Sequence, residues 1–293
     1  MRIALLGRVG QLGWELERTL ATLGEVIAFD FPEIDLRKPK SIPDLLRPIS
    51  PDIVVNATAY TAVDKAEDEP EIAMAINGHA PAVLAEIARS LSASLVHFST
   101  DYVFDGTKGN PYSEVDAPNP LNVYGQSKLA GEKAIQEIGG AYLILRTSWV
   151  YSLRRDNFVT KVLGWSRQQR TVRIVNDQFS NPTWCRMLAE TTAQLLVMGM
   201  PDIFGWLTDH HGLYHLAGTG VTNRYEWAKV ILENDPSRDE QIIEQLLPAL
   251  TSDFPSPARR PLYSALSSLS FYKTFGLQLP GWEDSLKLAM QPD

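Results

Sequence analysis

Short apolar runs alternate with longer amphipathic stretches through the first half of the chain. The apolar runs lack the strict in-out alternation of a half-solvated strand, so they are typical of parallel strands covered on both faces. Alternation of such strands with helices predicts an α/β fold with a doubly wound parallel sheet, the Rossmann arrangement. The expected strands are 2–7, 25–30, 52–58, 94–100 and 141–148, and the expected helices are 11–23, 39–48, 70–91 and 120–138.

The pattern changes after about residue 150. Strands at 171–177 and 213–217 and helices at 183–197 and 223–232 are now separated by long connections, and the last 40 residues are rich in proline, serine and aromatic residues. We therefore predict a dinucleotide-binding Rossmann domain over 1–150. Residues 151–293 are predicted to form mainly a smaller C-terminal substrate-binding lobe, with the helix near 183–198 returning to the sheet.

Composition narrows the class of protein. The chain has 293 residues, of which 44% are hydrophobic and 21% charged, and a formal net charge of -8. An acidic chain argues against nucleic-acid binding, which needs a basic face. The single cysteine, Cys185, excludes an internal disulfide and is expected to be a small buried hydrophobe. No signal peptide and no apolar run of about 20 residues is found, so we expect a soluble cytoplasmic protein with no membrane partner.

A glycine-rich turn links the first predicted strand to the first predicted helix. Gly7, Gly10 and Gly13 are spaced Gly-x-x-Gly-x-x-Gly, and Asp30 ends the second strand. Glycines allow a tight turn and a close approach of the backbone to a pyrophosphate, which the helix N-terminus attracts. A carboxylate at the second strand end accepts hydrogen bonds from an adenosine ribose. The four residues together predict dinucleotide binding.

Two residues near this turn favour different cofactors. The Arg8 guanidinium can pair with a 2′-phosphate and favours NADPH, whereas the Asp30 carboxylate favours NADH. The sequence leaves this choice open.

Tyr124 and Lys128 lie one helical turn apart in the predicted helix 120–138, so they share one helix face. An ammonium beside a phenol favours the phenolate, and we expect it to lower the pKa of Tyr124 from about 10. A tyrosine tuned in this way can exchange a proton with a carbinol oxygen. The pair alone is a weak signal, because this spacing is common on ordinary solvated helix faces.

Longer motifs identify a family resemblance. With the glycine turn, the stretches 99–106 (Ser-Thr-Asp-Tyr-Val-Phe-Asp-Gly) and 124–128 make the chain similar to the extended short-chain dehydrogenases/reductases. Within them it resembles the dTDP-4-dehydrorhamnose reductase family. The same resemblance extends over 56–67, 146–151, 176–178, Arg260-Pro261 and Ser264, and so over nearly the whole chain.

The resemblance implies an activity and three catalytic residues. The family uses NAD(P)H to reduce the 4-keto group of dTDP-4-dehydro-L-rhamnose, giving dTDP-L-rhamnose. By resemblance, Tyr124 is the general acid, Lys128 holds the nicotinamide ribose and lowers the Tyr124 pKa, and Thr100 hydrogen-bonds the substrate oxygen. Charge that develops on a ketone oxygen during hydride addition is stabilised by such hydroxyl donors.

Further binding residues follow from the same resemblance. Asp101, Trp149 and Arg260 are implied to contact the dTDP-sugar, and the pair Arg259–Arg260 is equally consistent with diphosphate binding and with surface cations. Trp149 is equally consistent with a core position. The implied cofactor contacts are Gly10, Gln11, Leu12, Asp30, Asp35, Leu36, Ala59, Tyr60, Thr61, Tyr124 and Lys128, with tyrosine at 60 where some family members have histidine.

Several alternatives stay open at the level of sequence. Some family members need Mg²⁺, but no metal-ligand cluster can be recognised, and Glu15 and Glu190 are expected to be solvated helix residues. An epimerase would share the glycine turn and the Tyr–Lys pair, whereas a dehydratase is disfavoured because Tyr102 replaces the expected glutamate. A non-enzymatic regulatory subunit, such as the β subunit of methionine adenosyltransferase, also resembles these reductases. A homodimer is one open alternative for the assembly.

Overall fold

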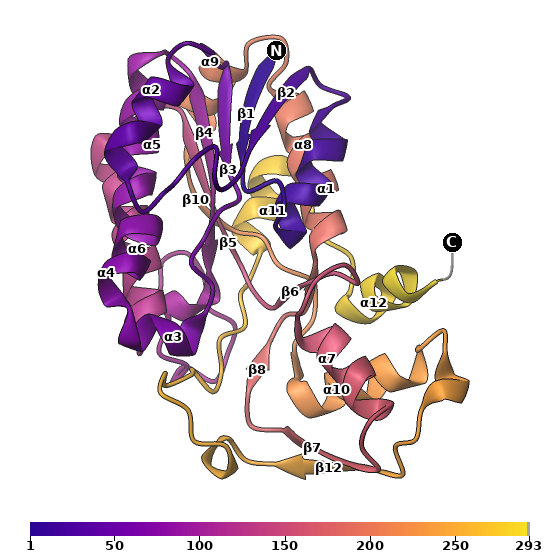
Figure 1. The fold of residues 1–293 in the computed structure, drawn as a ribbon. Coiled ribbons are helices and arrows are strands. Elements are labelled where there is room, and N and C mark those ends of the chain that lie inside the picture. Colours follow the sequence, from indigo (N-terminus) through magenta and orange to yellow (C-terminus); the bar gives the residue numbers. More distant parts are fainter. Residues whose placement is uncertain (292–293) are drawn as a thin grey trace.

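The computed structural model describes residues 1–291, and its centre is a six-stranded sheet (Figure 1). The strand order is β10-β5-β4-β3-β1-β2, and every neighbouring pair is parallel. The chain therefore forms the predicted doubly wound fold, and the order reverses between β1 and β3, where such sheets bind ligands. The strands are β1 (Arg2–Leu6), β2 (Glu25–Phe29), β3 (Ile53–Asn56), β4 (Ser94–Thr100), β5 (Tyr142–Thr147) and β10 (Gly212–His215).

Helices cover both faces of this sheet, which is why its strands are apolar throughout (Figure 1). One face packs against α1 and α8, which contact each other, and against α11. The other face packs against α2, α5 and α6. These helices are α1 (Gln11–Leu20), α2 (Ile42–Leu46), α5 (Ala80–Ser90), α6 (Val123–Ile138), α8 (Cys185–Met198) and α11 (Leu269–Phe275).

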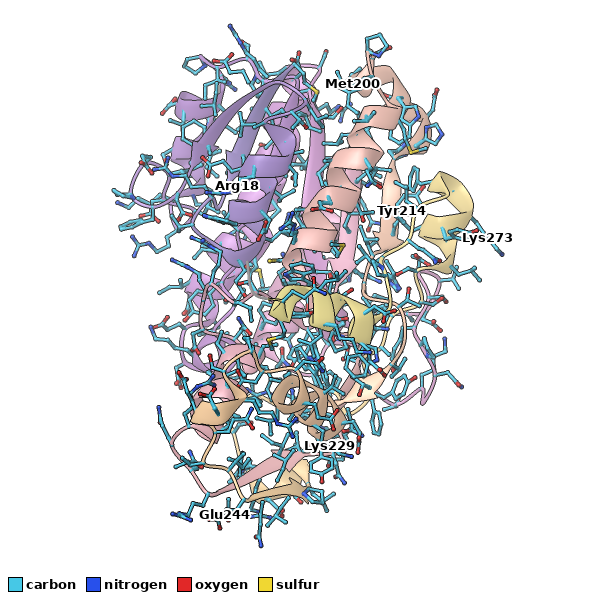
Figure 2. The ribbon with its side chains drawn as sticks, turned by 90° about the vertical axis from the view of Figure 1, so that its right-hand side faces the viewer. Arg18, Met200, Tyr214, Lys229, Glu244 and Lys273 are labelled. Atoms are coloured by element: carbon cyan, nitrogen blue, oxygen red, sulfur yellow. The ribbon has the colours of Figure 1, made fainter. Side chains whose placement is uncertain are left out.

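The second part of the molecule lies beyond the carboxyl ends of the strands. Helices α7 (Phe158–Ser166) and α10 (Arg224–Glu233) pack with α12 (Trp282–Met290) around a separate core that includes Trp227. A parallel pair, β7 (Thr171–Val175) and β12 (Gln245–Ala249), forms its outer edge. In Figure 2, Lys229 on α10 and Glu244 mark this lobe, and Arg18 on α1 and Tyr214 on β10 mark the sheet domain.

After residue 150 the chain passes between the two parts several times. The strand expected at 213–217 is β10, which completes the main sheet beside β5 and does not belong to the C-terminal lobe. Helix α11 also packs on the sheet domain. The smaller elements are α3 (Val63–Asp68), α4 (Pro70–Met74), α9 (Ile203–His210), β6 (Val150–Tyr151), β8 (Phe179–Ser180), β9 (Thr183–Trp184) and β11 (Thr222–Asn223).

The expected helix 70–91 is divided into three segments. A π-helical turn over Ala75–His79 separates α4 from α5. The wider turn is occupied by Asn77, which is buried and faces α6 and the segment after β3. Such π turns often occur at functional sites.

Helix α6 begins at Val123, three residues later than predicted, because Asn122 caps it. The Asn122 side chain accepts a hydrogen bond from the Gly125 N–H at 2.8 Å. Tyr124 thus lies in the first turn of α6. Among residues 1–291, no helix is both long and apolar enough to cross a membrane.

Candidate active site

The glycine turn between β1 and α1 has the geometry that its sequence predicted. Gly7 has a positive φ of 95°, which a residue with a side chain rarely adopts. A Cβ on Gly13 would lie 1.9 Å from the Gly7 carbonyl oxygen, so only glycine allows α1 to begin this close to β1. Gly10 stands at the N-terminus of α1 with no side-chain cap, leaving N–H groups for an anion.

Asp30 braces this turn from the end of β2. Its carboxylate accepts hydrogen bonds from the backbone N–H groups of Val9 at 2.9 Å and Phe31 at 2.8 Å. Asp30 also lines a cavity of about 270 Å³, together with three other predicted cofactor residues, Asp35, Leu36 and Ala59. The remaining lining residues are Phe31, Ile34, Arg37, Thr58 and Ile76.

Arg8 and Gln11 extend from the same turn in different directions. The Arg8 guanidinium forms an exposed ion pair with Glu33 at 3.0 Å. The Gln11 side-chain oxygen accepts hydrogen bonds from Ser152 at 2.9 Å and Asn157 at 3.0 Å, linking the turn to the segment that enters the lobe. Leu12 is buried in the core of the sheet domain.

The segment after β3, which contains Ala59, Tyr60 and Thr61, is held by Asn77. The Asn77 side chain accepts from the Tyr60 N–H at 2.8 Å and donates to the Tyr60 carbonyl at 3.1 Å. The Tyr60 phenol donates to Glu69 at 2.6 Å. This segment therefore has a fixed backbone at the carboxyl end of the sheet, beside the cavity that Asp30 lines.

Thr100 and Tyr124 meet at the carboxyl end of β4. Thr100 is the last residue of that strand, and its side chain lies close enough to the Tyr124 phenol to lower the pKa of that phenol. Its oxygen also accepts from the Tyr102 N–H at 3.2 Å, and it donates to Asp101 at 3.1 Å. The close approach of η3, the short helix Asp101–Val103, to α6 needs Gly125, since a Cβ there would lie 2.2 Å from the Tyr102 carbonyl oxygen.

Lys128 is buried and directed toward β4. Its amine donates to the Phe98 carbonyl oxygen at 2.6 Å and lies 3.3 Å from Nε2 of His97. Burial lowers the pKa of Lys128 to about 8. The structure thus brings Lys128 to the same helix face as Tyr124, with its amine held by backbone and by a histidine ring.

The expectation of a lowered Tyr124 pKa is wrong in direction. Loss of hydration raises the pKa of Tyr124 above its usual value, and the nearby Asp101 carboxylate adds to the rise. The Thr100 side chain opposes this rise without cancelling it. The phenol is therefore protonated at neutral pH, as a proton donor requires.

Asp101 lies at the junction of the two parts and is only 2% exposed. Its carboxylate accepts hydrogen bonds from Ser180 at 3.2 Å, from Ser264 and from Thr100 at 3.1 Å. Burial raises the pKa of Asp101 to about 6, and the three hydroxyl donors limit that rise. Asp101 therefore fixes Thr100 and ties two segments of the C-terminal half to β4.

A cavity of about 650 Å³ opens between α7, β7 and the segment 251–260. Arg224 and Arg260 both line it, and both act on the Tyr102 phenol beside it. Arg260 also pairs with Asp64 at 2.6 Å, whereas the side chain of Arg259 is exposed and only its backbone carbonyl is bound, by Asn122. Arg260 rather than Arg259 is thus placed for an anion.

Sequence reasoning missed Arg224, the first residue of α10. Its guanidinium lies 4.2 Å from the ring centre of Trp149 and 4.8 Å from that of Phe158. Trp149 has a positive φ of 40° and stacks on Trp227, so its ring belongs to the lobe's aromatic cluster and is covered by Arg224. The sequence signal that could have identified Arg224 was its position directly after the helix-capping residue Asn223.

Within 1–291, no group of three His, Cys, Asp or Glu side chains is arranged to hold a metal ion. Glu190 forms an ion pair with Arg186 at 2.9 Å. Cys185 is buried.

Fold and site together define a Rossmann-fold protein with the Thr–Tyr–Lys site of the extended short-chain dehydrogenases/reductases. The family model described as RmlD substrate binding domain matches residues 1–293. The chain belongs to the dTDP-4-dehydrorhamnose reductase family, as its motifs predicted.

Curated relatives and solved structures agree with this assignment. The chain is 42% identical to dTDP-4-dehydrorhamnose reductase of Escherichia coli K12, over 98% of this chain and 96% of that protein. It is 41% identical to the reductase of Burkholderia thailandensis, over 99% and 98%. A solved structure of the Bacillus anthracis reductase in complex with NADP is 32% identical, with a TM-score of 0.88 over 98% and 97% of the two chains.

A more distant structure supports the fold alone. The UDP-glucose 4-epimerase of Thermus thermophilus, solved with NAD, is 20% identical and has a TM-score of 0.79 over 99% and 98% of the two chains. It shares the Rossmann architecture.

Proposed function

We propose that this protein reduces the 4-keto group of dTDP-4-dehydro-L-rhamnose to give dTDP-L-rhamnose. One observation carries the proposal: Thr100 at the end of β4 acts on the protonated phenol of Tyr124, with Lys128 one turn further along α6. This group lies at the carboxyl end of the sheet on which the glycine turn also opens. The names of the relatives, at 42% and 41% identity over nearly full length, support the substrate.

The glycine turn and its surroundings fit a nicotinamide dinucleotide. The free N–H groups at the start of α1 would hold its pyrophosphate, and the cavity lined by Asp30, Asp35 and Leu36 would hold its adenosine. Ala59, Tyr60 and Thr61 would line its path toward Tyr124 and Lys128. When bound, this cofactor supplies the hydride that adds to C4 of the sugar.

We favour NADPH over NADH. The Asp30 carboxylate is engaged by two backbone N–H groups, while Arg8 reaches its partner Glu33 only in an exposed ion pair, which contributes little. Arg8 can exchange that partner for a 2′-phosphate. The NADP complex of the Bacillus anthracis relative agrees with this choice.

Tyr124 would act as the proton donor. As hydride adds to C4, negative charge develops on O4, and the phenol proton of Tyr124 moves to that oxygen. Thr100 would donate to the same oxygen by turning its hydroxyl away from Asp101. Lys128 would bind the nicotinamide ribose and stabilise the phenolate that Tyr124 becomes.

The dTDP portion would bind toward the lobe. Arg224 and Arg260 converge on Tyr102 and line the 650 Å³ cavity, where two guanidinium groups suit a diphosphate. Phe158 and Trp165 in the same cavity provide apolar surface for a base. Asp101 would orient Thr100 beside the sugar, and Trp149 would support Arg224.

The proposal is tested by incubating the protein with dTDP-4-dehydro-L-rhamnose and NADPH and identifying the product by NMR. We expect oxidation of one NADPH for each dTDP-L-rhamnose formed, with slower turnover on NADH. The same protein with UDP-glucose and NAD⁺ should give no 4-epimer. Absence of NADPH oxidation at any pH between 6 and 9, with and without Mg²⁺, would contradict the proposed function.

A further inference from the structure

A line of buried polar side chains joins β3 to the amine of Lys128. Asn56, the last residue of β3, is 1% exposed, and so is His97 in the middle of β4. The register pairs these two residues directly across the sheet. Nδ2 of Asn56 lies 3.0 Å from Nδ1 of His97, and Nε2 of His97 lies 3.3 Å from Nζ of Lys128.

The orientation of the Asn56 amide is fixed by Thr58. Oδ1 of Asn56 accepts from the Thr58 backbone N–H at 3.1 Å and from the Thr58 hydroxyl at 2.5 Å. A backbone N–H can only donate, so the oxygen of Asn56 must face Thr58. Its nitrogen therefore faces His97 and donates to Nδ1.

This donor determines the tautomer of the His97 ring. Nδ1 must be the unprotonated nitrogen, because it accepts from Asn56. Burial and the charge of Lys128 hold the pKa of His97 well below its usual range, so the ring is neutral and carries its one proton on Nε2. That N–H is directed at the Lys128 amine.

A donor directed at an amine has consequences for its protonation. A neutral amine can accept the Nε2–H of His97 through its lone pair, while one N–H donates to Phe98 and one stays free for a ligand. An ammonium has no lone pair, so its third hydrogen would point at the Nε2–H. The neighbouring charge on α6, Glu132, acts in the opposite sense and favours the ammonium, although it is itself paired with Arg146 of β5 at 2.6 Å.

We propose that Thr58, Asn56 and His97 form a positioning chain that fixes the Nε2–H tautomer of His97 and so opposes protonation of the Lys128 amine. His97 is thus a positioning residue that acts through Lys128. The inference rests on the proposed function, because that function is what assigns roles to Lys128 and Tyr124.

The tautomer can be measured on the protein alone, with no cofactor and no substrate. ¹⁵N NMR of the histidine-labelled protein at pH 7.5 should show one buried ring protonated at Nε2 and not at Nδ1, and this signal should be missing in His97→Gln. Asn56→Asp replaces the donor by an acceptor, and we expect the His97 proton to move to Nδ1. A wild-type His97 protonated at Nδ1, or an imidazolium, would overturn the inference without any variant having to fold.

The effect on Lys128 is measured by titrating the lysine ¹³Cε signals of the same proteins. In Asn56→Asp, Nε2 becomes an acceptor, and the midpoint of Lys128 should rise by about one pH unit or more. A buried carboxylate at position 56 also acts directly through space, so the double variant Asn56→Asp/His97→Gln is the matched control. If the tautomer is the cause, most of the rise disappears when His97 is absent.

An equal rise with and without His97 would show that the effect is only electrostatic and would refute the positioning chain. Failure of the proposed function gives a different result. In that case the tautomer and the Lys128 titration would be as expected, but the protein would not reduce the 4-keto sugar. If the function holds, the alkaline limb of kcat/KM should move with the Lys128 midpoint in Asn56→Asp, while Asn56→Asp/His97→Gln should restore most of the wild-type profile.

Discussion

The pKa values of single residues at this site are determined mainly by burial. Tyr124, Lys128 and Asp101 all lose hydration, and in each case loss of hydration is the largest cause of the pKa shift. Burial raises the pKa of the phenol and of the carboxyl and lowers that of the amine. Tyr124 therefore keeps its phenol proton at neutral pH, and this is the proton that the proposed reduction would use.

Asp101 makes stability depend on pH. Its pKa is raised from 3.8 in the unfolded chain to about 6 in the fold, so the folded state binds the proton more tightly. Its contribution is complete below the unfolded value and is lost as pH rises through about 6. Relative to Asp101→Asn, whose amide does not titrate, the wild-type free energy of unfolding should fall by up to about 3 kcal/mol between pH 3.5 and 7. Urea unfolding at both pH values measures this, and an unchanged difference would contradict it.

The sequence predicted the residues of the site better than their interactions. Strands buried on both faces and glycines at a strand end are local signals, so the sheet, the glycine turn and the position of Thr100 could be inferred. The direction of the Lys128 amine depends on His97, 31 positions away along the chain, and no local pattern shows that contact. Arg224 was missed because only tertiary folding places the start of α10 over Trp149.

At the level of elements, the ends of helices determine the site. Helix α1 begins on the glycine turn, and α6 begins at the Asn122 cap just before Tyr124. Strand β10 could not be assigned from the sequence order, because nothing local shows that the chain returns to β5. The first turns of these helices thus hold the candidate site residues, and the sheet determines where the helices begin.

Gly13→Ala should disrupt the turn that begins α1. The new Cβ would overlap the Gly7 carbonyl oxygen at 1.9 Å, and backbone atoms cannot move aside cheaply. We expect a loss of about 3 kcal/mol or more in the free energy of unfolding and loss of NADPH binding. The matched control is Gly164→Ala in α7, where a Cβ meets nothing within 4 Å and should be neutral or stabilising by up to about 1 kcal/mol. Equal effects of the two substitutions on unfolding would refute the steric argument.

Asn122→Ala tests whether the cap of α6 affects catalysis as well as stability. It removes the cap on Gly125 and the hydrogen bond to the Arg259 carbonyl at 2.8 Å, so about 1–2 kcal/mol of stability should be lost. Because Tyr124 lies in the first turn, kcat should also fall by about tenfold. Asp202→Ala removes the equivalent cap of α9, on Gly205, far from the site. It should cost similar stability while kcat is retained, and an equal fall in kcat would contradict the local effect.

For the molecule as a whole, the candidate active site lies where the two parts meet. Asp101 binds Ser180 and Ser264, Gln11 binds Ser152 and Asn157, and Asp64 pairs with Arg260. Each contact joins the sheet domain to a segment from the C-terminal half. The sheet would present cofactor and catalytic residues, and the lobe would hold the nucleotide.

Arg224→Lys tests this division of labour. Lysine keeps the charge but loses the planar group that covers Trp149 and reaches Tyr102. We expect KM for the dTDP-sugar to rise by about tenfold or more, with the Kd for NADPH unchanged. Arg238→Lys, an exposed position of the same lobe, should change neither constant. A weaker NADPH affinity in Arg224→Lys would show that the two sites are not separate.

The central claim is that Tyr124 donates the proton to the sugar oxygen. The most direct measurement is single-turnover reduction of dTDP-4-dehydro-L-rhamnose by NADPH-loaded Tyr124→Phe, compared with the wild type and with Tyr272→Phe, which changes a tyrosine that is 48% exposed on α11. We predict that Tyr124→Phe binds NADPH normally but reduces the ketone about 10²–10⁴-fold more slowly, while Tyr272→Phe keeps the wild-type rate. A wild-type rate in Tyr124→Phe would contradict the account.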